Sequence, residues 1–324
     1  MKSYSAIFLA CLLTGAGFDT VAQDTYPGKP ITLTIPFPAG GASDVTGRKV
    51  GAMLTAELGQ PVIIDNRPGA GGNIAMDYIA GGTGDGYSLL QGSMSIIALN
   101  PNTYKNLKTR PVRDLALLKV ATEGSLVLAI HPDLPVRTLK EFIDYSRANP
   151  GKVNYASAGS GGITHVGMEL LRSKTGLDAS HVPYKGGAAA MPDLLAGRVH
   201  AMLDLYSQLG PFINQGKLRA IAVTNEQRSI FSPDVPTLKE SGYPGLSFTS
   251  WTGFFVPART PAHIQAILRA SLEKIVESKE FEAYLAQVQN SKAPRMTAEQ
   301  MNRFVQLEND RWGEIIRAAS ITAD

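Results

Sequence analysis

The chain has 324 residues, of which 44% are hydrophobic and 18% charged, the composition of an ordinary globular protein. Its length suggests about two domains. The net charge of +3, with no basic run and no interleaving of aromatic and basic residues, argues against a nucleic-acid partner.

The N-terminus has the three parts of a secretory signal peptide. Lys2 supplies the positive charge, residues 6–13 form a short apolar segment, and residues 20–22 are small enough for a cleavage site. The apolar segment is far shorter than the roughly 20 residues that span a membrane. We therefore expect residues 1–22 to be removed and a periplasmic chain to begin at Gln23.

Cys11 is the single cysteine. It lies inside the apolar segment and apolar residues follow it, whereas a lipoprotein signal places its cysteine at the end of that segment. We therefore expect no lipid on Cys11. Without residues 1–22 the chain has no disulfide or thiol chemistry, which suits an oxidising compartment such as the bacterial periplasm.

The first half alternates strands and helices around glycine-rich loops. A strand at residues 31–35 leads through Gly40 and Gly41 into a helix at residues 44–58, which Ser43 or Asp44 could cap. Such a helix N-terminus attracts anions, although a plain turn is the simpler interpretation of this segment alone. The spacing does not fit a phosphate-binding loop. Strands at 62–65 and 87–91, a glycine-rich loop at 67–73 and a helix at 74–80 follow, an order that predicts a parallel sheet.

The pattern then recurs. Strands are predicted at residues 126–131, 153–157, 180–184, 199–205 and 218–223, and helices at 138–149, 163–175 and 188–195. Residues 158–162 form another glycine-rich turn between a strand and a helix. A strand at 250–256 and amphipathic helices at 260–278 and 297–319 end the chain, and we expect them to pack back on the first lobe.

Eight segments, in order, resemble one family, the Bug-type periplasmic solute receptors of tripartite tricarboxylate transporters. The segments are distributed along the mature chain, at residues 26–31, 36–41, 66–73, 85–87, 154–157, 181–186, 218–220 and 234–237. The resemblance implies an α/β clamshell of the two-lobed periplasmic binding protein type (type II-like), with a mainly parallel sheet flanked by helices in each lobe. We place lobe I at residues 23–122 and 226–324 and lobe II at 123–225, with crossings near 122–124 and 224–226.

The resemblance also implies a function. Members bind small carboxylates, such as di- or tricarboxylates, aromatic acids or amino acids, and deliver them to the membrane subunits of the transporter. They have no catalytic residue, no metal and no cofactor. We expect this chain to be a monomer that binds its ligand between the lobes.

The site residues follow from matching motifs and from strand ends. The first-lobe loop contributes Phe37, Ala39, Gly40, Gly41, Ser43 and Asp44. The second-lobe loop contributes Ser157, Gly159, Ser160, Gly161, Gly162, Thr164 and His165. Asp204, Gln91 and Ser93 follow or end strands and are further candidates.

Several of these residues have a structural alternative. His165 could be a satisfied structural histidine, and Asp204 could equally cap the end of its sheet. Phe37 and Trp251 could wall the pocket, but buried aromatic residues are more often core. Tyr184 and its neighbour Lys185 could reach the cleft or only close a turn.

Two rival functions remain. Ser160 within residues 158–162 resembles a hydrolase nucleophile elbow, with His165 as its base, but Ala158 replaces the first glycine and His165 is only five residues from Ser160. A metal-binding receptor would use the scattered histidines, which lack ligand spacing. These are His131, His165, His181 and His200.

Overall fold

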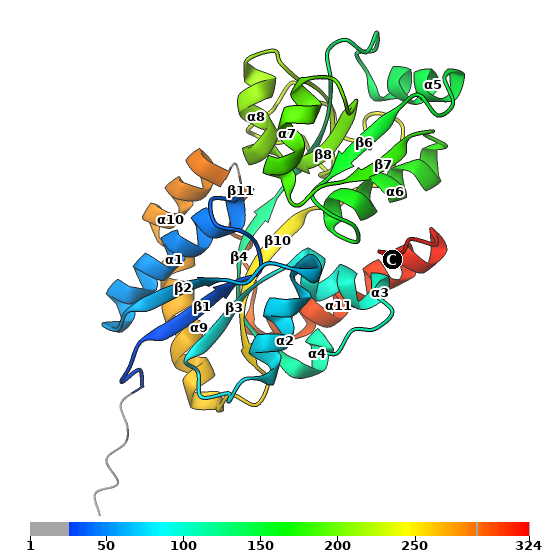
Figure 1. Cartoon of the computed structure of the whole chain (residues 1–324). Helices are drawn as coiled ribbons and strands as arrows, with labels where there is room; N and C mark the ends of the chain where they lie inside the picture. Colours follow the sequence, from blue (N-terminus) through cyan, green and yellow to red (C-terminus); the bar gives the residue numbers. More distant parts are fainter. Residues whose placement is uncertain (1–25, 290, 324) are drawn as a thin grey trace, which may run out of the picture.

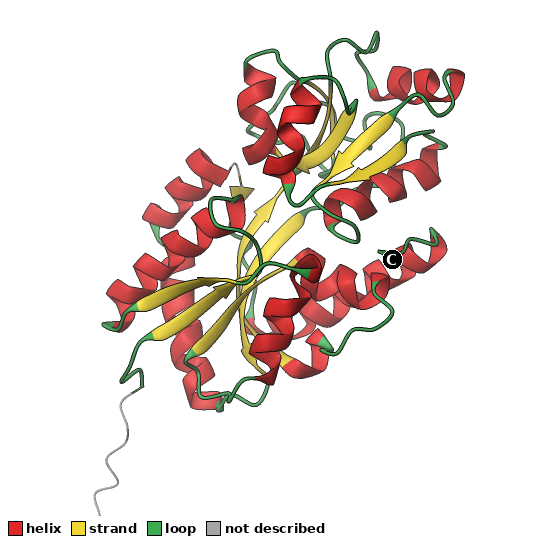
Figure 2. Ribbon diagram, in the orientation of Figure 1, coloured by secondary structure: helices red, strands yellow, loops and turns green. Residues whose placement is uncertain are grey.

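The computed structural model describes residues 26–289 and 291–323, so the predicted signal peptide and Cys11 lie outside the described part. The described chain forms two lobes, each built on one sheet with helices on both faces (Figures 1 and 2). The predicted two-lobed α/β class is confirmed. None of the described helices is both long and apolar enough to cross a membrane.

The first sheet has a mixed strand direction. Its strands, in spatial order, are β11 (Ser291–Lys292), β4 (Leu115–Gly124), β10 (Ser250–Pro257), β3 (Ser88–Ser93), β1 (Ile31–Ile35) and β2 (Val62–Asn66). Strand β1 pairs in parallel with β2 and β3. Strand β10 is antiparallel to both β3 and β4, and β11 is antiparallel to β4.

The second sheet is also mixed. Its order is β7 (Ser180–Pro183), β6 (Asn154–Ser157), β8 (Ala201–Leu205), β5 (Leu126–Ile130) and β9 (Arg219–Val223). Strand β6 is parallel to β7 and β8, whereas β5 is antiparallel to β8 and β9. Both sheets are therefore mixed, although most of their strands share one direction: β1, β2, β3 and β4 in the first sheet, and β6, β7, β8 and β9 in the second. The strands that carry the chain between the lobes, β5 and β10, enter each sheet from the opposite end and so run against their neighbours.

Helices cover both faces of the first sheet. One face carries α1 (Ala42–Leu58), α9 (Ala262–Val276) and α10 (Lys279–Tyr284), followed by the π-helical turn η3 (Leu285–Gln289). The other carries η1 (Ala70–Gly72), α2 (Asn73–Gly81), the π-helical turn η2 (Ser95–Leu99), α3 (Asn100–Thr103), α4 (Pro111–Asp114) and α11 (Ala298–Ala318). Successive residues of one strand face opposite sides. Leu89 accordingly packs on the face covered by α1 and α9, and Leu90 packs on the face covered by α2 and α11.

The second lobe follows the same plan. Helices α5 (Leu139–Ala148) and α6 (Ile163–Thr175) lie on one face, and α7 (Gly187–Leu195) and α8 (Tyr206–Asn214) on the other. Val127 and Leu128 of β5 point to the two different cores. Both faces of the sheet are therefore buried, which explains the continuous apolar runs of these strands.

The chain crosses between the lobes twice. The first crossing is Ser125, between β4 and β5, and the second is the long segment 224–249 between β9 and β10. Most of that segment packs on the second lobe: the Leu238 N–H donates to the Val223 carbonyl and the Phe248 N–H to the Thr224 carbonyl. These contacts lead us to propose that lobe II extends to about residue 248 instead of ending at residue 225.

Candidate binding cleft

The first-lobe loop is held by Asp44. The Gly40 N–H donates to Asp44 Oδ2 (2.9 Å), and Asn66 Nδ2 donates both to Asp44 Oδ1 (3.0 Å) and to the Phe37 carbonyl (3.1 Å). Burial would raise the pKa of Asp44, but hydrogen bonds from Arg48, the Gly40 N–H and Asn66 outweigh it and lower that pKa. Both carboxylate oxygens are engaged inside the protein. We therefore reassign Asp44 from ligand contact to shaping the loop.

The N-terminus of α1 has no side-chain cap within the described chain. Its N-cap is Gly41, with φ −79° and ψ 170°, so Ser43 and Asp44 already lie inside the helix and cannot cap it as expected. Ala39 and Gly40 are exposed and Phe37 is partly exposed at the tip of the loop. Uncapped N–H groups of a first turn need an acceptor from outside the helix.

The second-lobe loop repeats this construction. The N-cap of α6 is Gly162, with φ −78° and ψ 170°, and it also lacks a side-chain cap. Gly161 (φ 78°) matches Gly40 (φ 84°). The Gly161 N–H donates to His165 Nδ1 (3.1 Å), the same four-residue step by which Gly40 reaches its carboxylate. The two glycine-capped turns therefore share one geometry, Gly-Gly followed at the third residue by an inward-facing acceptor.

Other side chains of the second-lobe loop also point inward. Thr164 Oγ1 accepts the Ala158 N–H (2.9 Å), and Ser157 Oγ lies 2.6 Å from His181 Nε2 and 3.2 Å from the Gly159 amide nitrogen. Ser157 is fully buried. We assign Ser157, Thr164 and His165 to holding the loop. Gly159, Ser160, Gly161 and Gly162 form its rim.

The histidines beneath this loop are kept neutral. The rings of His165 and His181 stack with centroids 3.9 Å apart, and burial lowers the pKa of His181 to about 4 and that of His165 in the same direction. Because His165 Nδ1 accepts the Gly161 N–H, it has no free nitrogen there to act as a base for Ser160. The geometry gives the hydrolase alternative no support.

The depressed pKa of His181 predicts acid sensitivity. The unfolded chain takes up this proton near pH 6.5 and the folded chain only near pH 4, so the stability held above pH 6.5 is lost as the pH falls through this window. Through this histidine, the parent protein is expected to lose about 2 kcal/mol of unfolding free energy between pH 7 and pH 4. The His181→Gln variant should not show this part of the loss. Urea unfolding at both pH values measures it. Asp204→Asn is the control: burial raises the Asp204 pKa to about 6, so its contribution has the opposite sign.

The two candidates at the end of β3, Gln91 and Ser93, differ in role. Gln91 is buried, and its Nε2 donates to the Ser43 carbonyl (3.0 Å). Ser93 Oγ is buried with no partner among the described residues, and Ser93 lies opposite Thr252 in the sheet. We reassign Gln91 to positioning α1, and we keep Ser93 as a candidate contact.

A recess of about 40 Å³ lies beside the N-terminus of α1. Hydroxyl groups dominate its lining, which comprises Ala42, Ser43, Thr46, Thr122, Gly124, Leu205, Ser250, Thr252 and Ser291. Leu205, at the end of β8, brings the second lobe to this recess. The preceding residue, Asp204, faces the other way: Oδ1 accepts the Leu205 N–H (2.7 Å), and a Cβ at Gly187 of α7 would lie 2.4 Å from Oδ2. Asp204 thus fits the sheet-end alternative rather than the cleft.

The lobes touch across the cleft. Ser95 Oγ, from η2, accepts the N–H of Ile163 (3.1 Å), the first residue of α6. A Cβ at Gly161 would lie 2.8 Å from Ala323 Cβ and 3.1 Å from Thr103 Oγ1. Ser95 and Asn66 were not among the predicted site residues. The sequence pattern held no signal for Ser95, whereas Asn66 begins one of the matched segments.

The remaining aromatic candidates are structural. Trp251 is buried, and its Nε1 donates to Glu308 Oε2 (2.9 Å) on α11. Tyr184 donates its hydroxyl to Asp193 Oδ2 (2.7 Å) and so closes the turn before α7. Among the described residues, no group of three or more histidine, cysteine, aspartate or glutamate side chains is placed to hold a metal ion, so the scattered histidines give the metal alternative no support.

Residues 46–321 match the model of the tripartite tricarboxylate transporter family receptor. The chain belongs to this family. It is therefore a solute-binding receptor rather than an enzyme. A UPF0065 protein of Bordetella pertussis is 36% identical to this receptor over 91% of the chain and 90% of its own length. The protein BugT of the same organism is 34% identical over 92% and 91%.

Solved structures agree with this assignment. R. palustris Rpa4515 with adipate is 31% identical, with a TM-score of 0.86 over 92% of this receptor and 99% of that chain. MatC from Rhodopseudomonas palustris with bound malate is 30% identical, with a TM-score of 0.83 over 90% and 100%. The periplasmic binding protein BugD is 30% identical, with a TM-score of 0.84 over 92% and 99%.

Proposed function

We propose that this receptor binds a small dicarboxylate between the two glycine-capped turns and delivers it to the membrane subunits of a tripartite tricarboxylate transporter. The observation that carries the proposal is the matched geometry of Gly40-Gly41 and Gly161-Gly162, each opening a helix whose N-cap glycine has no side chain to cap it, in a different lobe. Ser95 Oγ accepts one of the first N–H groups of α6, that of Ile163. One carboxylate at each turn uses both helix N-termini. Tricarboxylates and aromatic acids are the variants to compare.

Hydrogen bonds from the two turns can supply the free energy of binding that such a receptor needs. Each charge-assisted hydrogen bond contributes about 1.5–3 kcal/mol. A micromolar receptor needs roughly 8 kcal/mol, so a few backbone N–H bonds reach it without an arginine clamp. Adipate and malate, which similar structures contain, are both small dicarboxylates and support this class.

A thermal-shift screen of aliphatic and aromatic di- and tricarboxylates tests the proposal. Adipate and malate belong in the screen, and hexanoate, which lacks the second carboxylate, is the matched control for adipate. We expect a dicarboxylate to raise the melting temperature while its monocarboxylate counterpart does not. Equal effects of both members of a pair would contradict binding at two ends.

We also propose that the protein acts in the periplasm as a monomer and is exported by residues 1–22. The mature chain is expected to begin at Gln23 with an unmodified amino group. Mass spectrometry of the exported protein measures both properties, with the uncleaved cytoplasmic precursor as the reference mass. A chain that begins at a lipid-modified Cys11 would contradict this prediction.

A further inference from the structure

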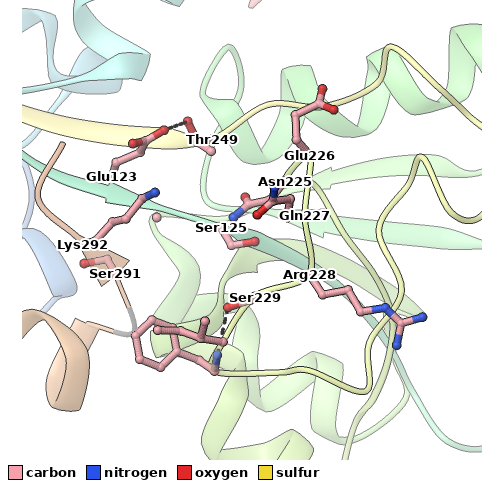
Figure 3. Close-up of a pocket in the computed structure, with 13 residues that line it drawn as sticks. Glu123, Ser125, Asn225, Glu226, Gln227, Arg228, Ser229, Thr249, Ser291 and Lys292 are labelled. Atoms are coloured by element: carbon pink, nitrogen blue, oxygen red, sulfur yellow. Dashed lines mark hydrogen bonds between the residues drawn. The ribbon is translucent and has the colours of Figure 1, made fainter. Parts of the chain in front are cut away.

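A cavity of about 370 Å³ lies where the two crossings between the lobes run together (Figure 3). Glu123, Thr249 and Lys292 line it from the first lobe. Asn225, Ser229 and Phe231 line it from the segment that follows β9. The volume is within the range of small-molecule sites.

The sheet order places this cavity at one edge of each sheet. In the first sheet, β4, β10 and β3 separate β11, which borders the cavity, from β1, which ends at the first glycine-capped turn. In the second sheet, β5 and β8 separate β9 from β6, which ends at the second turn. The cavity adjoins the recess beside α1, with which it shares Gly124 and Ser291, but none of its other lining residues borders that recess.

Two charged side chains at the cavity, Glu123 and Lys292, form no ion pair with any of the described residues. Lys292 lies directly across from Glu123 in the β11–β4 pair, yet no ion pair joins them there. Glu123 Oε1 accepts only the Thr249 hydroxyl (3.0 Å). The other charges are committed elsewhere: Arg228 turns away and pairs with Glu240, and Glu226 pairs with Lys239 (Figure 3).

Two polar atoms at the cavity also lack partners. Asn225 Oδ1 and Ser291 Oγ are buried and have no hydrogen-bond partner among the described residues. A buried polar group without a partner costs about 1–3 kcal/mol. The cavity therefore offers hydrogen-bonding capacity from both lobes, together with one carboxylate and one ammonium group.

We propose that this cavity is a second ligand site, for a small zwitterion of the α-amino acid class. A simple anion would meet the Glu123 carboxylate, and a simple cation would meet the Lys292 ammonium group. A zwitterion satisfies both, with its ammonium group at Glu123 and Asn225 Oδ1 and its carboxylate at Lys292. Because both lobes supply the walls, the bound molecule would also bias the angle between them.

The test begins with a thermal-shift screen of the twenty standard amino acids and glycine betaine, followed by calorimetry on the best of them. We expect Glu123→Gln and Lys292→Met each to weaken its binding by about tenfold or more, since each removes a charge-assisted hydrogen bond. Arg228→Met is the matched control, because that side chain points away, and it should bind like the parent. The exposed Lys292 side chain can be replaced without disturbing the fold.

A reciprocal comparison of two variants with two ligands distinguishes the second site from the first, and it rests on the proposed carboxylate cleft. Gly40→Val should retain amino-acid binding and lose dicarboxylate binding, and Lys292→Met should show the reverse. If no zwitterion binds, or if Gly40→Val abolishes zwitterion binding while Lys292→Met does not, the second site is overturned. A failure of every dicarboxylate to bind would count against the proposed function alone.

Discussion

Replacing Gly40 by valine is expected to weaken dicarboxylate binding by at least about 100-fold, the equivalent of losing one or two charge-assisted hydrogen bonds. Gly40 has φ +84°, and a Cβ there would have nothing within 4 Å, so the added side chain would extend into the space where the ligand approaches the backbone. Gly161→Val should be at least as damaging, because its Cβ would also lie 2.8 Å from Ala323 Cβ across the cleft. Calorimetry with the best ligand of the screen measures both.

Gly59→Val is the matched control. Gly59 ends α1 with φ +68° and also has nothing within 4 Å of a Cβ, but it lies at the opposite end of the helix from the cleft. It carries the same kind of backbone strain, about 1–3 kcal/mol, without touching the proposed site. If Gly40→Val and Gly161→Val fold and bind like Gly59→Val, the glycine-capped turns are ordinary turns.

Replacing Asp44 by alanine is expected to weaken binding by about 10- to 100-fold although the side chain does not face the cleft. The change removes the acceptor of the Gly40 N–H and one of the two acceptors of the Asn66 amide, which still donates to the Phe37 carbonyl. A hydrogen bond lost in this way costs about 1–3 kcal/mol. The loop would then lose the conformation that presents its backbone. Chemical unfolding measures the stability loss, and calorimetry measures the affinity.

Asp65→Ala supplies the comparison for Asp44→Ala. Asp65 pairs with Arg67 on the same edge of the sheet, but its side chain is 30% exposed. Surface ion pairs of this kind contribute about 0–1 kcal/mol, so little change in either measurement is expected. Asp44→Ala binding as tightly as Asp65→Ala would show that the loop does not need its anchor.

The sequence predicted those strands and helices whose own residues show a clear hydrophobic pattern. The strand Ile31–Ile35 and the helix Ile163–Thr175 were predicted with the observed bounds. Strand β4 was missed, because it contains Lys119 in its buried interior. Glu273 and Glu277 of α9 pair with that lysine, and no local pattern could indicate such distant partners. Helix α8 was missed; it contains Pro211, as the correctly predicted α7 contains Pro192, so proline alone does not explain the difference.

The site was predicted at the level of loops and not of side chains. Both glycine-rich turns were expected, and the structure places each at the start of a helix. The direction of Asp44 and His165 was not foreseen, although the common spacing from Gly40 and Gly161 is visible in the sequence. The direction of Asp204 depends on which face of β8 meets α7, and that is decided by tertiary packing.

The position of β10 between β3 and β4 has a consequence for how the chain folds. All five strands of the second sheet come from residues 126–223, so that sheet can form as soon as this continuous stretch is available. In the first sheet, β3 and β4 share no pairing until β10 arrives, and β10 begins only at Ser250, long after β4 ends at Gly124. The middle of the chain is therefore expected to fold before its beginning. Until then, the early strands of the first lobe keep open edges that can pair with other chains.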